Sequence, residues 1–109
     1  MSAGTGNDLE ITVQEYVRDW QETPHVLVDC REQDEWEDGH IASATLIPLG
    51  DFAARSGELD RDQPVAVICR SGRRSLMAAE YLKELGFAKP VSVAGGMIAW
   101  AEARQPIVR

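Results

Sequence analysis

Short β-branched runs alternate with longer helical patterns along this chain, and the alternation restricts its fold more than any other feature. Residues 25–30, 65–68 and 91–93 are apolar runs, each followed by a stretch with helical character. Near-continuous apolar strands are typical of parallel sheets that are buried on both faces, and helices between such strands cover those faces. The sequence therefore predicts an α/β domain with a central, mostly parallel sheet of about five strands and helices on both faces.

Local patterns indicate where the elements begin and end. Thr12 and Glu15 fit a capping box at the start of a helix that reaches about Trp20. Gly86 suits a left-handed helix end, with Phe87 packing back on the helix as in a Schellman motif. Residues 45–49 read as a strand near a sheet edge because Pro48 interrupts them. Residues 50–58 predict a brief helix and a loop. The remaining predicted helices cover 32–38, 75–85 with Leu76, Ala79 and Leu82 buried, and 97 to about 104.

Length and charge limit the kind of protein this can be. The 109 residues suit one domain, and we expect 1–8 to be a flexible N-terminal tail and 9–109 the domain. A net charge of −7 argues against nucleic acid as a partner. No apolar run approaches a membrane span or a signal-peptide core, which favours a cytoplasmic location, free thiols and no membrane partner. For a small acidic domain we expect a monomer. The histidines lack metal-ligand spacing, so we expect neither metal nor cofactor.

The segment 69–75, Cys-Arg-Ser-Gly-Arg-Arg-Ser, lies between a strand and a helix. Backbone N–H groups at a helix N-terminus have no intrahelical partner and carry partial positive charge, so they stabilise an anionic sulfur. The pKa of the Cys69 thiol is therefore expected to fall below its free value of roughly 8.5. Three guanidinium groups, those of Arg70, Arg73 and Arg74, would hold an anionic substrate. Ligand sites lie beyond the carboxyl ends of parallel strands. We therefore expect the segment that follows residue 28 to lie next to Cys69, at the same ligand site.

Four short motifs occur in an order and spacing that resemble the rhodanese homology family. They are Asp29-Cys30-Arg31-Glu32, Gly39-His40-Ile41, Cys69-x-x-Gly72-x-Arg74-Ser75 and Gly95-Gly96-Met97-x-x-Trp100. The resemblance spans about residues 9–104 and is to a single-domain member. It implies a sulfurtransferase that moves a sulfane sulfur from thiosulfate or another persulfide donor to a thiol, cyanide or protein acceptor.

The resemblance also implies roles for individual residues. Cys69 would be the nucleophile that becomes a persulfide, with Gly72 allowing a tight turn around the bound anion. The amides of 70–75, including that of Ser71, would cradle the terminal sulfur, and the three arginines would orient the anionic donor. The Ser75 hydroxyl would either hydrogen-bond the sulfur or cap the helix. Asp29 and Arg31 would tie loops together near the site.

Other residues near these motifs have simpler interpretations. We expect His40 to pack and to hydrogen-bond to backbone. The acidic residues of 34–38 suit a solvated helix face. Cys30 fits a small buried hydrophobe, although a Cys30 that approached Cys69 could act as a resolving thiol.

Two other functions remain open from the sequence. A phosphatase or arsenate reductase also uses a cysteine and an arginine around an oxyanion, but such phosphatases have five residues between the two. Here Arg74 follows Cys69 one position too early for that spacing. A non-catalytic binding module is the other alternative, although modules of that kind typically lack the cysteine.

Overall fold

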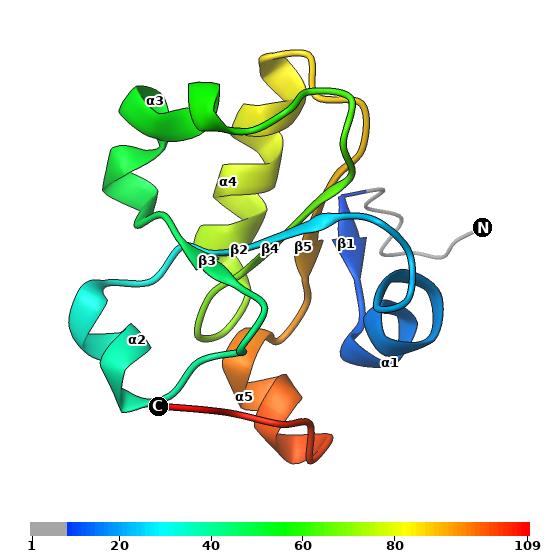
Figure 1. Cartoon of the computed structure of the whole chain (residues 1–109), viewed down its shortest axis with the longest axis vertical. Coiled ribbons are helices and arrows are strands. Elements are labelled where there is room, and N and C mark those ends of the chain that lie inside the picture. Colours follow the sequence, from blue (N-terminus) through cyan, green and yellow to red (C-terminus); the bar gives the residue numbers. More distant parts are fainter. Residues whose placement is uncertain (1–8) are drawn as a thin grey trace.

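A computed structural model describes residues 9–109 and contains one five-stranded sheet (Figure 1). The strand order is β1-β5-β4-β2-β3, and every neighbouring pair is parallel. The strands are β1 (Glu10–Ile11), β2 (Val26–Asp29), β3 (Thr45–Leu46), β4 (Val65–Ile68) and β5 (Pro90–Val93). The predicted parallel sheet is confirmed, and β3 lies at its edge as Pro48 indicated. The expected tail 1–8 lies outside the described residues.

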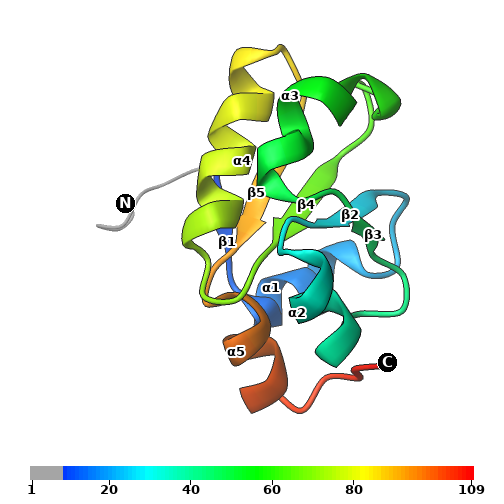
Figure 2. The same ribbon diagram turned by 90° about the vertical axis from the view of Figure 1, so that its left-hand side faces the viewer.

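Helices cover both faces of this sheet. They are α1 (Val13–Glu15), continued by a π-helical turn (Tyr16–Trp20), α2 (Gln33–Asp38), α3 (Phe52–Arg55), α4 (Arg73–Glu84) and α5 (Gly96–Glu102), with 3₁₀ turns at Leu49–Asp51 and Ser56–Glu58. Figure 2 shows α3 and α4 on one side of the sheet and α1 and α5 on the other. The π-helical turn was not predicted, whereas the layered arrangement was.

The hydrophobic core consists of two clusters separated by the sheet. One contains Ile68 of β4 with Trp100 of α5 and Tyr16, and the other contains Val67 of β4 with Leu82 of α4. Successive residues of a strand point to opposite faces. Strand β4 is therefore buried on both sides, which is why its sequence is apolar throughout.

The predicted helix caps are present. Thr12 accepts from the Glu15 amide at 3.0 Å, and the Glu15 carboxylate accepts from the Thr12 amide at 2.8 Å. At the end of α4, Phe87 N donates to Leu82 O at 3.1 Å, and Gly86, at φ 92°, donates to Lys83 O at 3.0 Å. This is the Schellman pattern.

The predicted start of one helix and the predicted burial of one of its residues were wrong. Helix α4 begins at Arg73 rather than Ser75 because Gly72, in the left-handed region at φ 102°, reverses the chain and serves as its N-cap. Ser75 therefore lies inside the first turn and is not a cap. Leu76 is only half-buried, and Ala78 takes its expected place in the core beside Ala79.

Strand β1 was missed because it is only two residues long, and its partner β5 is distant in sequence. Across residues 9–109 no helix has both the length and the apolar character needed to cross a bilayer.

Candidate functional site

Cys69 is the first residue after β4, at the carboxyl end of the central strand. The loop that starts there turns at Gly72 and enters α4. The Cys69 sulfur accepts hydrogen bonds from the backbone amides of Gly72 at 3.0 Å and Ser75 at 3.3 Å, and the Ser75 hydroxyl oxygen lies 3.4 Å from the sulfur. The sequence therefore brings the cysteine and the N-terminus of a twelve-residue helix together, as predicted.

The pKa of the Cys69 thiol lies far below its ordinary value, at about 4. The largest cause is a hydrogen bond from the neighbouring Cys30 side chain, followed in the same direction by the Ser75 hydroxyl and the two amides. Burial acts in the opposite direction and is outweighed. The direction of this shift favours the thiolate form of Cys69, which is the form that reacts.

Cys30 lies beside Cys69 because of the strand register. Asp29 pairs with Ile68 across β2 and β4, so the next residue of each strand is one of the two cysteines. The two thiols are not joined in a disulfide, and both residues are buried. The hydrogen bond to Cys69 and burial raise the pKa of Cys30, which therefore stays protonated as a donor. The predicted small buried residue is thus also an electrostatic partner of Cys69.

The Gly95-Gly96 turn holds the outer side of the loop. Met97 N donates to Cys69 O at 2.7 Å, and Ile98 N donates to Arg70 O at 3.0 Å. A Cβ on Gly96 would collide with those same backbone atoms, so only glycine permits this approach. The first residues of α5 therefore donate hydrogen bonds to carbonyl oxygens of the Cys69 loop. The amides on the other side of that loop remain available to the sulfur.

The three arginines do not share one environment. Arg74 forms a bidentate ion pair with Glu35 of α2, at 2.8 and 2.9 Å, with both side chains about one-third exposed or less. Arg70 and Arg73 are exposed, and neither makes an ion pair within residues 9–109. Arg70 and Arg73 therefore carry positive charge that no carboxylate of residues 9–109 pairs with.

Glu35 was missed by sequence reasoning, which placed it on a solvated helix face. The Arg74 ion pair lowers the pKa of its carboxyl to about 2. Its partner lies 39 positions along the chain, so no local pattern could have indicated the pair.

Asp29 and Arg31 form a buried ion pair at the end of β2. The Arg31 guanidinium donates to both Asp29 oxygens at 2.8–3.1 Å and to Gly39 O at 2.7 Å. This links the end of the strand to the end of α2. His40 stacks on the Trp36 ring, with centroids 3.7 Å apart, and its Nδ1 lies 2.8 Å from Trp36 O.

A shallow hollow of about 340 Å³ lies beside the loop. Its charged lining residues are two arginines and two carboxylates, and its other lining residues are apolar: Arg31, Glu35, Asp38, Arg70, Met97, Ile98 and Ala101. Arg70 directly follows Cys69, so the hollow borders the start of the loop.

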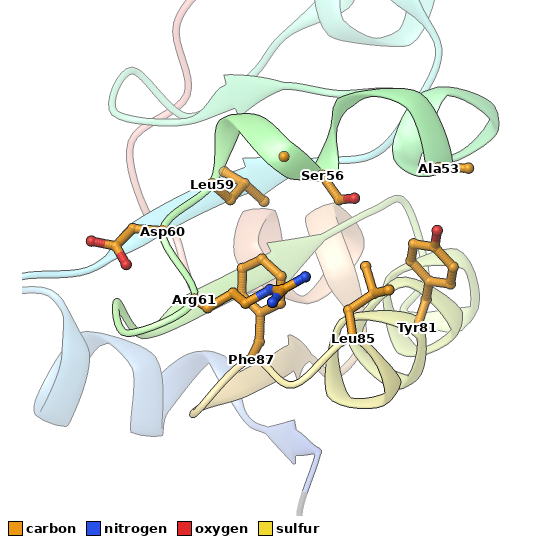
Figure 3. A pocket seen from close by; sticks show the side chains of 9 residues that line it. Ala53, Ser56, Leu59, Asp60, Arg61, Tyr81, Leu85 and Phe87 are labelled. Atoms are coloured by element: carbon orange, nitrogen blue, oxygen red, sulfur yellow. The ribbon is translucent and has the colours of Figure 1, made fainter.

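A separate cavity of about 550 Å³ lies between the Leu59–Arg61 segment and α4, where Tyr81 and Leu85 face it (Figure 3). Its residues precede β4 and β5, so it sits at the amino ends of the strands and contains none of the loop. In the described part of the chain, no three His, Cys, Asp or Glu side chains are grouped as a metal site.

This geometry defines a class of protein: a parallel α/β domain whose central strand delivers a cysteine thiolate into a turn closed by a helix N-terminus. Residues 13–103 match the model of the rhodanese-like domain family, and the chain belongs to that family. The resemblance noted from the four motifs is thereby confirmed.

Several proteins with similar sequences are named as sulfurtransferases or as a sulfur carrier. The chain is 44% identical over 80 residues to the "Putative sulfurtransferase YtwF" of Bacillus subtilis, covering 73% of this chain and 77% of that protein. It is 39% identical over 83 residues to a "Sulfurtransferase" of Allochromatium vinosum, covering 76% and 78%. It is 43% identical over 74 residues to the "Putative sulfur carrier protein YrkF" of B. subtilis, but these span 68% of this chain and only 40% of that protein.

Solved structures agree with the fold. A rhodanese-related protein from Thermoplasma volcanium superposes with a TM-score of 0.83 at 33% identity, covering 91% of this chain and 96% of the other. A rhodanese-like domain protein from Staphylococcus aureus gives a TM-score of 0.77 at 33% identity, covering 84% and 89%.

Proposed function

We propose that this chain is a sulfurtransferase that carries a sulfane sulfur on Cys69, from thiosulfate or another persulfide donor to a thiol, cyanide or protein acceptor. One observation carries the proposal: the Cys69 sulfur accepts hydrogen bonds from two backbone amides at the N-terminus of α4, and these bonds lower the pKa of its thiol. A thiolate held in that way is a nucleophile that is ready at neutral pH.

In the first half-reaction the Cys69 thiolate attacks the outer sulfur of thiosulfate. A bond forms between the two sulfurs, and the sulfur–sulfur bond of thiosulfate breaks with its electron pair leaving on sulfite. Charge balances, since thiolate and thiosulfate become persulfide and sulfite, and no external oxidant is needed. The amides of residues 70–75 stabilise the terminal sulfur of the persulfide, while Arg70 and Arg73 compensate the charge of the donor.

In the second half-reaction an acceptor attacks the outer sulfur of the Cys69 persulfide. The bond to Sγ breaks, and its electron pair returns to Cys69 as thiolate. Cyanide would leave as thiocyanate, and a thiol would leave as a persulfide. Because Cys69 is regenerated, the kinetics are ping-pong.

The names of the similar proteins support this assignment at the level of sulfur transfer. The spacing of the loop supports it against phosphate chemistry, because a turn one residue shorter fits a single sulfur better than a phosphoryl group. The alternative of a non-catalytic module is disfavoured by the retained cysteine and its lowered pKa.

Steady-state sulfur transfer tests the proposal. Purified protein is given thiosulfate and cyanide at several fixed concentrations of each, and thiocyanate is measured. We expect parallel double-reciprocal lines and complete loss of turnover in Cys69→Ser. Turnover of an aryl phosphate without any thiocyanate would establish the phosphatase alternative instead. A folded protein that turns over neither substrate would support the binding module.

A further inference from the structure

A second serine lies behind the Cys69 site. Ser92 of β5 is fully buried, and its hydroxyl oxygen lies 2.7 Å from that of Ser75, which is also fully buried. Ser75 in turn lies 3.4 Å from the Cys69 sulfur. Cys69 of the loop, Ser75 of α4 and Ser92 of β5 therefore form one hydrogen-bonded chain.

The face of the sheet explains why Ser92 reaches this line. Ser92 pairs with Val67 across β4 and β5, and Val67 belongs to the cluster on the α4 side. Its neighbours Val91 and Val93 belong to the cluster on the opposite face. The Ser92 side chain thus points toward α4, where Ser75 occupies the first turn.

The direction of the hydrogen bonds follows from proton counting. A thiolate can only accept, and a serine hydroxyl has one proton to give. When Cys69 is a thiolate, Ser75 donates that proton to sulfur, so the bond between the serines requires Ser92 to donate to Ser75. Ser75 Oγ then accepts a hydrogen bond from Ser92 while the Ser75 hydroxyl donates one to the Cys69 sulfur. This arrangement polarises and orients the Ser75 O–H bond.

We infer that Ser92 is a positioning residue that holds the Ser75 hydroxyl with its proton directed at the Cys69 sulfur. Ser92 does not touch the reacting atoms. The consequence for catalysis rests on the proposed sulfur transfer, whereas the hydrogen-bond relay itself does not. No role for this position follows from the four sequence motifs.

The ionisable groups around Cys69 stay constant when Ser92 changes. They are Cys30, which directly follows β2, and Arg74 with its Glu35 partner. Arg70 lies in the loop and Arg73 begins α4. Asp29 nearby is paired with Arg31. A shift in Cys69 ionisation in a Ser92 variant therefore reports on the serine pair.

The test is a double-mutant cycle that follows the thiolate absorbance of Cys69. Each protein is measured after rapid acid jumps, before unfolding, and the signal of its Cys69→Ala counterpart is subtracted. We expect Ser92→Ala to raise the pKa of Cys69 by about half a unit, equal to an approximately threefold lower thiolate-to-thiol ratio. In the Ser75→Ala background, Ser92→Ala should add nothing.

Val93→Ala is the matched control. Val93 is equally buried on the same strand but faces the other cluster. It should lower the unfolding temperature at least as much as Ser92→Ala and leave the Cys69 titration unchanged. An unchanged titration in Ser92→Ala, an equal shift in the Ser75→Ala background, or an equal shift in Val93→Ala would each overturn the inference. Because the titration needs no donor, a failure of sulfur transfer would leave its result intact.

Discussion

Glu35 and Arg74 join α2 to the first turn of α4 through two parallel hydrogen bonds of 2.8 and 2.9 Å. The pair lies at the rim of the Cys69 loop and occupies the guanidinium that the sequence had placed among the donor-binding groups. Its first effect is structural, because it clamps a short helix that buries no residue of its own.

We predict that Glu35→Gln lowers the free energy of unfolding by about 1 kcal/mol at neutral pH. The folded-state pKa of Glu35, about 2, lies below its ordinary value of 4.5. The stabilisation is therefore complete above that ordinary value and is lost as the pH falls toward 2. Urea denaturation at several pH values should show the wild-type advantage shrinking in acid. An advantage that stays constant down to the folded-state pKa would contradict this account.

A second prediction concerns charge at the rim. Arg74→Ala leaves the Glu35 carboxylate without its partner, so it should weaken transfer from the thiosulfate dianion. Adding Glu35→Gln to that variant removes the unpaired negative charge and should restore part of the loss in kcat/KM. The loss would instead persist unchanged in the double variant if Arg74 binds the donor directly.

Arg70 and Arg73 are predicted to supply the free positive charge. Arg70→Gln should lower kcat/KM for thiosulfate by about fivefold at low ionic strength, and added salt should reduce the difference. Arg61→Gln is a suitable control because Arg61 is also exposed but lies at the amino ends of the strands, away from the loop. Equal losses in both variants would mean that the effect comes from net charge alone.

Gly96 supports the loop by its lack of a side chain. Gly96→Ala should cost about 3 kcal/mol of stability, because the φ of 56° strains alanine and the new Cβ meets the backbone of Cys69 and Arg70. The pKa of Cys69 should rise as its loop shifts. Gly57→Ala has open space around it and should change neither quantity. Thermal unfolding and the thiolate titration provide both measurements.

Local patterns were sufficient for most of the fold. The Thr12–Glu15 box and the Gly86–Phe87 helix end depend on residues within a few positions of each other, so the sequence alone predicts them. Strand β1 depends on pairing with a strand about eighty positions away. Its two residues carry no pattern of their own.

The residues of the site also divide into those that the local sequence predicts and those that only tertiary packing brings to the site. Cys69, Gly72 and Ser75 lie within one short segment whose chemistry can be interpreted directly from the sequence. Glu35 and Ser92 reach that segment only through tertiary packing, and a serine in a buried strand has no distinguishing pattern. The start of α4 was misplaced because Gly72 caps the helix by its backbone conformation rather than by a side chain.

Cys30 provides a test of the thiolate itself. Its side chain is the largest cause of the lowered Cys69 pKa, so Cys30→Ala should raise that pKa measurably in the thiolate titration. Cys30→Ser keeps a donor at the same place and should restore part of the shift. No rise in Cys30→Ala would show that the amides and Ser75 suffice.

The intact mass of the protein after a single exposure to thiosulfate, without any acceptor, tests whether Cys69 carries the sulfur. We predict a gain of one sulfur atom per chain, located at Cys69 by peptide mapping, removed by cyanide and absent from Cys69→Ala. Cys30→Ala should still gain it. No gain in the folded wild-type protein, or an undiminished gain in Cys69→Ala, would contradict the assignment of Cys69 as the sulfur-carrying residue.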